Sequence, residues 1–169
     1  MWQTVLWRQF GAAIDMLDDA LRDCPDELWT AEVWEERTVP GFSAFWCLAH
    51  HALFWLDYHL SCSPESFAPP APFGLEELDP AGALPPRVYS REELRGYLAY
   101  GRRKCRETIA SLTEEGLARP CRAGRRELPL AEALLYNMRH IQEHAAQLNV
   151  FLGQRAGSAV AWVGQAREP

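Results

Sequence analysis

The stretch "LAEALLYNMRHIQEHAAQLNVFL", residues 130–152, has apolar side chains that recur every three or four positions. This spacing predicts a long amphipathic helix that begins at Pro129 and ends at Gly153. Its apolar seam consists of Leu134, Met138, Ile141, Ala145, Leu148 and Leu152. His140 and His144 lie at the edge of this seam, about 40° from each other at 100° per residue. The helix therefore presents two imidazoles on one strip, one turn apart.

Three other segments show the same helical periodicity. They cover residues 2–23, residues 43–60 and a segment that Ser90 opens, with Glu93 completing a capping box. No segment alternates apolar and polar side chains with period two, so no sheet is predicted. Four amphipathic helices of this length predict an all-α fold, a four-helix bundle.

The connection between the second and third helices, residues 61–89, is long and rich in proline. Such a connection can cross the bundle, so that these two helices need not be antiparallel neighbours. Long loops in compact domains are often functional, and this one is a candidate pocket wall. In the short tail that follows the fourth helix, Trp162 is expected to pack back onto the bundle.

Composition narrows the class of protein. The 169 residues fit one domain, 1–169, and 48% of them are hydrophobic. The net charge of −6 argues against nucleic acid or an anionic membrane as a partner. The chain begins without the features of a signal peptide, and residues 43–60 carry three histidines and an aspartate, which indicates a buried helix rather than a membrane span. The five scattered cysteines predict reduced thiols in a cytoplasmic protein.

A third metal ligand would have to come from another helix, and residues 43–60 offer His50, His51 and His59. His51 shares its strip with an apolar and aromatic set: Ala44, Cys47, Leu48, Trp55 and Tyr58. His50 points about 100° away toward Asp57, so it is expected to be exposed or paired with that carboxylate. His59, near the helix end, is expected to be structural. If the helix over residues 43–60 contacts the one over residues 130–152, then His51, His140 and His144 form one site, with open positions as in catalytic zinc centres.

Other interpretations of these residues stay open. The histidines could simply bond to carbonyls or water, and Cys47 could be a fourth ligand or a small buried side chain. The sequence "HIQEH" matches a protease motif, but the chain lacks the distant acidic ligand, and Glu143 points to the polar side. The Glu-x-x-His pairs of di-iron bundles and a glycine-rich phosphate loop are both missing from the sequence.

The stretches "FWCLAHHALFWLDYHL" and "ELPLAEALLYNMRHIQEHAAQLNVFLGQ" resemble the DinB/YfiT-like superfamily. The resemblance implies an up-down-down-up bundle, a zinc or nickel ion bound by His51, His140 and His144, and a homodimer. Some relatives carry another histidine at the position of Cys47. Characterised relatives include transferases and isomerases that use low-molecular-weight thiols, whose pKa a metal would lower.

Three classes of function compete. In the first, the protein is a metal-dependent enzyme acting on a small molecule, with a thiol transferase favoured over a hydrolase. The pocket or the ligand orientation would then be shaped by Cys47, Trp55, Tyr58, Asn137 and Gln147. In the second, the protein is a binding or sensor module with a structural metal. In the third, it is an interaction protein with packed histidines and no metal.

Overall fold

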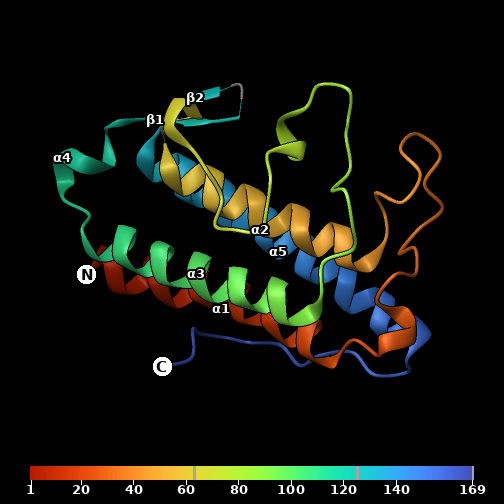
Figure 1. The fold of residues 1–169 in the computed structure, drawn as a ribbon. Coiled ribbons are helices and arrows are strands. Elements are labelled where there is room, and N and C mark those ends of the chain that lie inside the picture. The colour runs from red at the N-terminus through yellow and green to blue at the C-terminus, as the bar shows by residue number, and fades with distance from the viewer. Residues whose placement is uncertain (63, 125, 169) are drawn as a thin grey trace.

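The computed structural model describes residues 1–62, 64–124 and 126–168 and confirms the predicted helical fold. Four long helices account for most of it (Figure 1): α1 (Trp2–Asp23), α2 (Phe45–Ser61), α3 (Arg91–Ala110) and α5 (Leu130–Arg155). The shorter elements are the helix α4 (Glu114–Leu117), the strands β1 (Pro120–Ala123) and β2 (Arg126–Pro129), and the single turns η1 (Asp26–Leu28), η2 (Pro64–Ser66) and η3 (Glu76–Leu78). None of the helices described is long and apolar enough to cross a membrane.

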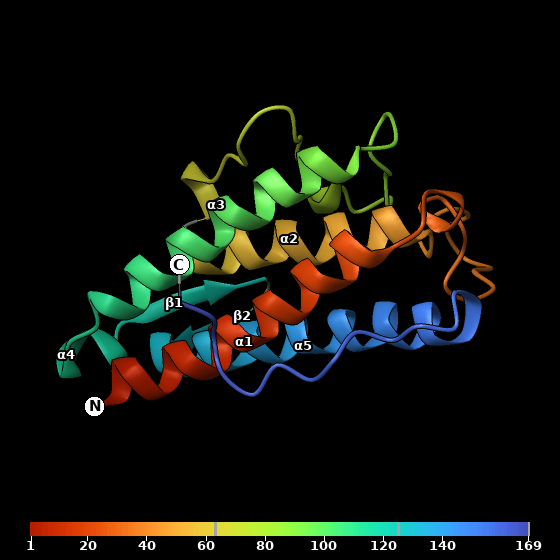
Figure 2. The same cartoon turned by 90° about the horizontal axis from the view of Figure 1, so that it is seen from below.

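The four long helices pack in two pairs of neighbours around a shared core. α1 contacts α3 and α5, and α2 contacts the same two helices on the other side. In Figures 1 and 2 the chain runs from left to right along α1 and α5 and from right to left along α2 and α3. The segment between α2 and α3 therefore returns along the length of the molecule before α3 begins. This path carries it past the face where α2 meets α5.

Local signals explain where α3 and α5 begin and end. The Ser90 side chain accepts a hydrogen bond from the backbone N–H of Glu93 (3.2 Å), and the Glu93 carboxylate accepts one from the N–H of Ser90 (2.8 Å), as the capping box predicts. The predicted end of α5 is wrong, because the helix continues through Gly153 to Arg155. It stops before Gly157, whose φ of +69° is the left-handed conformation typical of a helix C-terminus.

A two-stranded antiparallel hairpin between α4 and α5 corrects the prediction of no sheet. β1 pairs with β2 so that Cys121 faces Leu128. The two strands have four residues each, which is too short for alternation to stand out in the sequence.

The prediction of five reduced cysteines is also wrong, because a disulfide joins Cys62, just beyond α2, to Cys121 of the hairpin. These residues lie 59 positions apart, so no spacing pattern reveals the bond. Cys24, Cys47 and Cys105 are free thiols in the buried core. The hairpin is therefore tied covalently to the end of α2.

The C-terminal tail runs back along α1 (Figure 2) but does not use the predicted tryptophan. Trp162 is 73% exposed, and Val163 is buried instead. The tail is held by polar contacts: the N–H of Ala166 donates to the carbonyl of Arg8 (2.8 Å), and the Arg167 guanidinium pairs with Asp19. The sequence favoured Trp162 because it is the larger aromatic side chain. Hydrogen bonds set the path of the tail, and the periodicity of apolar residues does not predict them.

Candidate metal centre

The three histidines predicted as ligands lie together between α2 and α5. His51 comes from α2, and His140 and His144 come from α5. Each offers a ring nitrogen, and these nitrogens all lie within 4.8 Å of one another. The Nε2 atoms of His140 and His144 are 3.0 Å apart. Two bonds of about 2.0–2.1 Å from zinc to imidazole nitrogen can span that separation, so one ion could contact both rings.

Hydrogen bonds at the far nitrogen fix the orientation of two of the three rings. The Nδ1–H of His51 donates to the Glu77 carboxylate (2.7 Å), and the Nδ1–H of His144 donates to the amide oxygen of Gln147 (2.8 Å). A proton on Nδ1 leaves the lone pair of Nε2 directed at the centre of the cluster. Metal-bound histidines in proteins usually have such an acceptor behind them. Among the described residues, Nδ1 of His140 is buried without a partner.

The electrostatics of the cluster favour neutral imidazoles, the form that binds metals. Burial, with the neighbouring histidines adding to it, lowers the pKa of His140 to about 3. Burial likewise lowers the pKa of His144 to about 4. Burial alone would raise the pKa of Glu77, but its hydrogen bond to His51 and the charge of that ring hold it below its usual value. The site therefore combines two neutral rings on α5, His140 and His144, with an ionised carboxylate behind His51.

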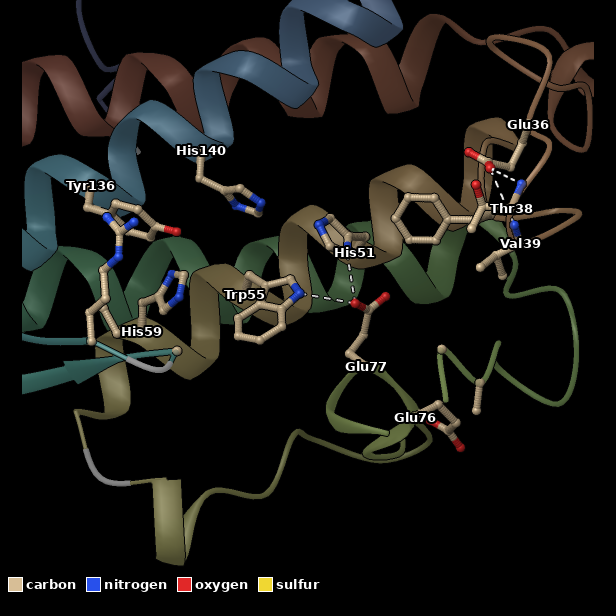
Figure 3. A pocket seen from close by; sticks show the side chains of 16 residues that line it. Glu36, Thr38, Val39, His51, Trp55, His59, Glu76, Glu77, Tyr136 and His140 are labelled. Atoms are coloured by element: carbon tan, nitrogen blue, oxygen red, sulfur yellow. Dashed lines mark hydrogen bonds and ion pairs between the residues drawn. The ribbon is translucent and has the colours of Figure 1, made fainter. Parts of the chain in front are cut away.

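Glu77 is a member of the candidate site that the sequence did not reveal. It belongs to η3 in the crossover between α2 and α3, and its Oε2 atom also accepts a hydrogen bond from the indole N–H of Trp55 (3.0 Å). The segment "LEELD" contains three acids, and irregular backbone gives no periodicity that tells which one faces inward. Figure 3 shows Glu77 reaching toward His51 and Trp55 while Glu76 points away.

The expected environment of His50 is wrong. Its side chain is fully buried, and its ring packs against Phe73 and Tyr89. Burial lowers the pKa of His50 to about 4. Asp57, the expected partner, instead accepts hydrogen bonds from Lys104 (2.5 Å) and from the hydroxyl of Tyr97. The crossover covers α2 on the side that periodicity alone assigns to solvent.

The remaining candidate pocket residues have different surroundings. Cys47 is fully buried, is not one of the side chains whose ligand atoms converge, and burial raises the pKa of its thiol to about 12. Tyr58 packs against Phe54 and Phe67 and also against Trp55 and His59, but it does not itself line the cavity. Asn137 is buried, and its amide donates to the carbonyl of Leu56 (3.0 Å). These three side chains contribute to packing, whereas Trp55 and Gln147 contact the site or its ligands.

An open cavity of about 700 Å³ leads to His51 and His140 (Figure 3). Three segments without long helices form much of its wall: residues 36–42, residues 76–83 and, from the hairpin, Ala123, Gly124 and Arg126. α2 and α5 complete it with the aromatic side chains of Trp55, His59 and Tyr136. Small-molecule sites in proteins have volumes of about 300–1,000 Å³, so a cavity of this size could hold a small molecule.

The fold and this cluster define a helical protein with a candidate three-histidine metal centre. The chain belongs to the DinB superfamily, which it matches over residues 9–148. That match includes α2, most of α5 and all three histidines. A search among curated proteins finds none that matches the sequence.

Proposed function

We propose that the protein is a metal-dependent enzyme in which Nε2 of His51, His140 and His144 binds one divalent ion, zinc or nickel. The observation that carries this proposal is the pair of acceptors, Glu77 and Gln147, that directs Nε2 of two rings at a common point. No fourth protein ligand converges on that point among the described residues, which favours a centre with open positions. When bound there, the ion would act as a Lewis acid that lowers the pKa of a thiol or a water molecule.

The substrate would be a small molecule that enters through the cavity. Glu77 fixes both His51 and Trp55, so one carboxylate orients a ligand ring and a wall of the cavity. The histidine pattern resembles that of thiol-dependent relatives, which favours transfer involving a low-molecular-weight thiol over hydrolysis. Cys47 is not a candidate nucleophile, because its buried thiol stays protonated at neutral pH.

Metal content measured by mass spectrometry on protein purified without a histidine tag tests the centre. We expect one ion per chain in the wild type and loss of that ion in His51→Ala, His140→Ala and His144→Ala. His59→Gln is the matched control, since His59 lines the same cavity but lies outside the cluster. A wild-type protein that takes up neither zinc nor nickel would refute the centre.

The competing function is a binding module with a closed structural metal. X-ray absorption on the metal-loaded protein separates the two. Three imidazole nitrogens with one or two exchangeable oxygen ligands support the enzyme, and the loaded protein should then be screened for thiol transfer and hydrolysis. A coordination shell that is completed by sulfur or by a fourth imidazole would exclude an open position on the metal. That result would favour the binding module with a structural metal.

A further inference from the structure

The cavity beside the histidines carries opposite charges at its two ends. Figure 3 shows Glu36, Thr38 and Val39 at one end and His59 and Tyr136 at the other. Glu36 accepts hydrogen bonds from the backbone N–H groups of Thr38 (2.7 Å) and Val39, and these hold its pKa below the usual value. That end of the cavity is therefore anionic, and the Glu36 carboxylate already has backbone hydrogen-bond donors from its own chain.

The hairpin end contains a cation. Arg126, the first residue of β2, lines the cavity there, and its guanidinium offers several N–H donors to an anion. Across residues 1–62, 64–124 and 126–168, no carboxylate lies within ion-pair distance of Arg126. Arg122 on the neighbouring strand differs, because it pairs with Glu65 (3.1 Å).

Two further donors stand at the same end. The His59 side chain is only 4% exposed, and its ring lines the cavity. Its ring lies 5.3 Å from that of Tyr136 and 6.2 Å from that of His140, measured between centroids. The Tyr136 hydroxyl can donate a hydrogen bond as well. A guanidinium, an imidazole and a phenol thus line the wall next to the metal-binding histidines.

The hairpin that carries Arg126 is positioned before any ligand arrives. Its strands pair with each other, and the disulfide ties β1 to the residue after α2. Binding to a side chain on such an anchored turn costs less ordering than binding to a free loop. The acidic end of the cavity would repel an anion, so an anionic ligand has one favourable orientation.

We propose that Arg126, Tyr136 and His59 form an anion-binding subsite, which takes a carboxylate or phosphate group of the small molecule that reacts at the three histidines. The proposal rests on the proposed function for the reacting end of that molecule. The subsite itself is formed by residues outside the histidine cluster, so its binding can be measured separately. It defines the substrate class as small anionic compounds whose charged group lies next to the reacting atom.

Titrations followed by proton–nitrogen NMR test the subsite on the full-length protein. The probes are acetate, inorganic phosphate and the neutral acetamide, at constant ionic strength. We expect saturable shifts in the hairpin and in the Trp55 indole with at least one anion and none with acetamide. The tighter of the two anions identifies carboxylate or phosphate as the group recognised. Loss of one charge-assisted bidentate contact in Arg126→Gln should weaken binding by about tenfold to a hundredfold.

Arg122→Gln is the matched control, because this arginine lies on the same hairpin, outside the cavity lining. It should bind the anion as the wild type does. The subsite is overturned if neither anion gives saturable shifts or if Arg126→Gln binds as tightly as the wild type. Uptake of zinc and nickel by the same samples separates the two proposals. Arg126-dependent anion binding in a protein that takes up neither zinc nor nickel supports the subsite and refutes only the metal centre.

Discussion

Removing the Cys62–Cys121 disulfide should lower stability by an amount that follows from the loop it closes. The cross-link joins residues 59 positions apart. The chain-entropy relation gives about 4 kcal/mol of stabilisation for a loop of that length. For a domain of this size, about 4 kcal/mol corresponds to a decrease of roughly 8–16 °C in melting temperature. The substitutions Cys62→Ser and Cys121→Ser, made together, should show this decrease.

The assay is thermal unfolding followed by circular dichroism, with and without dithiothreitol. Serine suits the position of Cys121, because the sulfur there lies 3.6 Å from the carbonyl of His59, which a hydroxyl can reach with a small adjustment. The wild type should melt earlier when reduced, while the double variant should not respond to the reductant. If the oxidised wild type, the reduced wild type and the double variant all melt within about 2 °C of one another, the loop-closure reasoning is wrong.

Two further predictions concern the histidines. Replacing Glu77 by glutamine removes the negative charge behind the Nδ1–H of His51. Metal affinity should then fall by about 10- to 100-fold in a chelator-competition titration. Glu76→Gln is the control, because Glu76 lies on the same turn but is directed away from the cluster, and this variant should bind metal as the wild type does. The metal-free protein should lose stability in acid, because its buried histidines have folded pKa values of about 3 to 4 while the unfolded chain takes up protons near pH 6.5. The loss should begin as the pH falls below about 6.5 and continue to about pH 3–4, where the folded-state pKa values lie. Its slope should reach about 1.4 kcal/mol per pH unit for each such histidine, and these groups should cause no change in stability above pH 7. Urea midpoints that are equal at pH 7.5 and pH 5 would contradict the assignment of neutral buried rings.

The elements that the sequence predicted correctly depend on local signals. The capping box of Ser90 and Glu93 involves residues three positions apart, and the apolar seam of α5 involves residues three or four apart. The proximity of His140 and His144 follows from helix geometry alone. The placement of His51 beside them needed one tertiary assumption, that α2 and α5 are in contact, and the structure has that contact.

The features that the sequence did not reveal depend on the irregular segments. Periodicity assigns His50 to a solvent face, but the crossover covers that face with Phe73 and brings Glu77 to the histidines. The disulfide and the hairpin depend on where the chain returns after α4, about 60 residues beyond α2. No local sequence signal, at the end of α2 or in the hairpin, predicts that these two parts of the chain come into contact. A search for the acceptor behind His51 would have had to weigh every acid of the crossover equally.

The candidate metal ligands and the walls of the cavity belong to different parts of the architecture. The histidines are on α2 and α5, whose apolar faces fill the core. Among the described residues of the three wall segments, only Ala123 is a buried member of that core. Surface connections tolerate insertion and substitution far better than packed helices do. On the proposed function, the metal centre and the choice of substrate could therefore change independently over evolution. For protein engineering, this separation makes the three connections the natural targets for a loop library that retains the histidines.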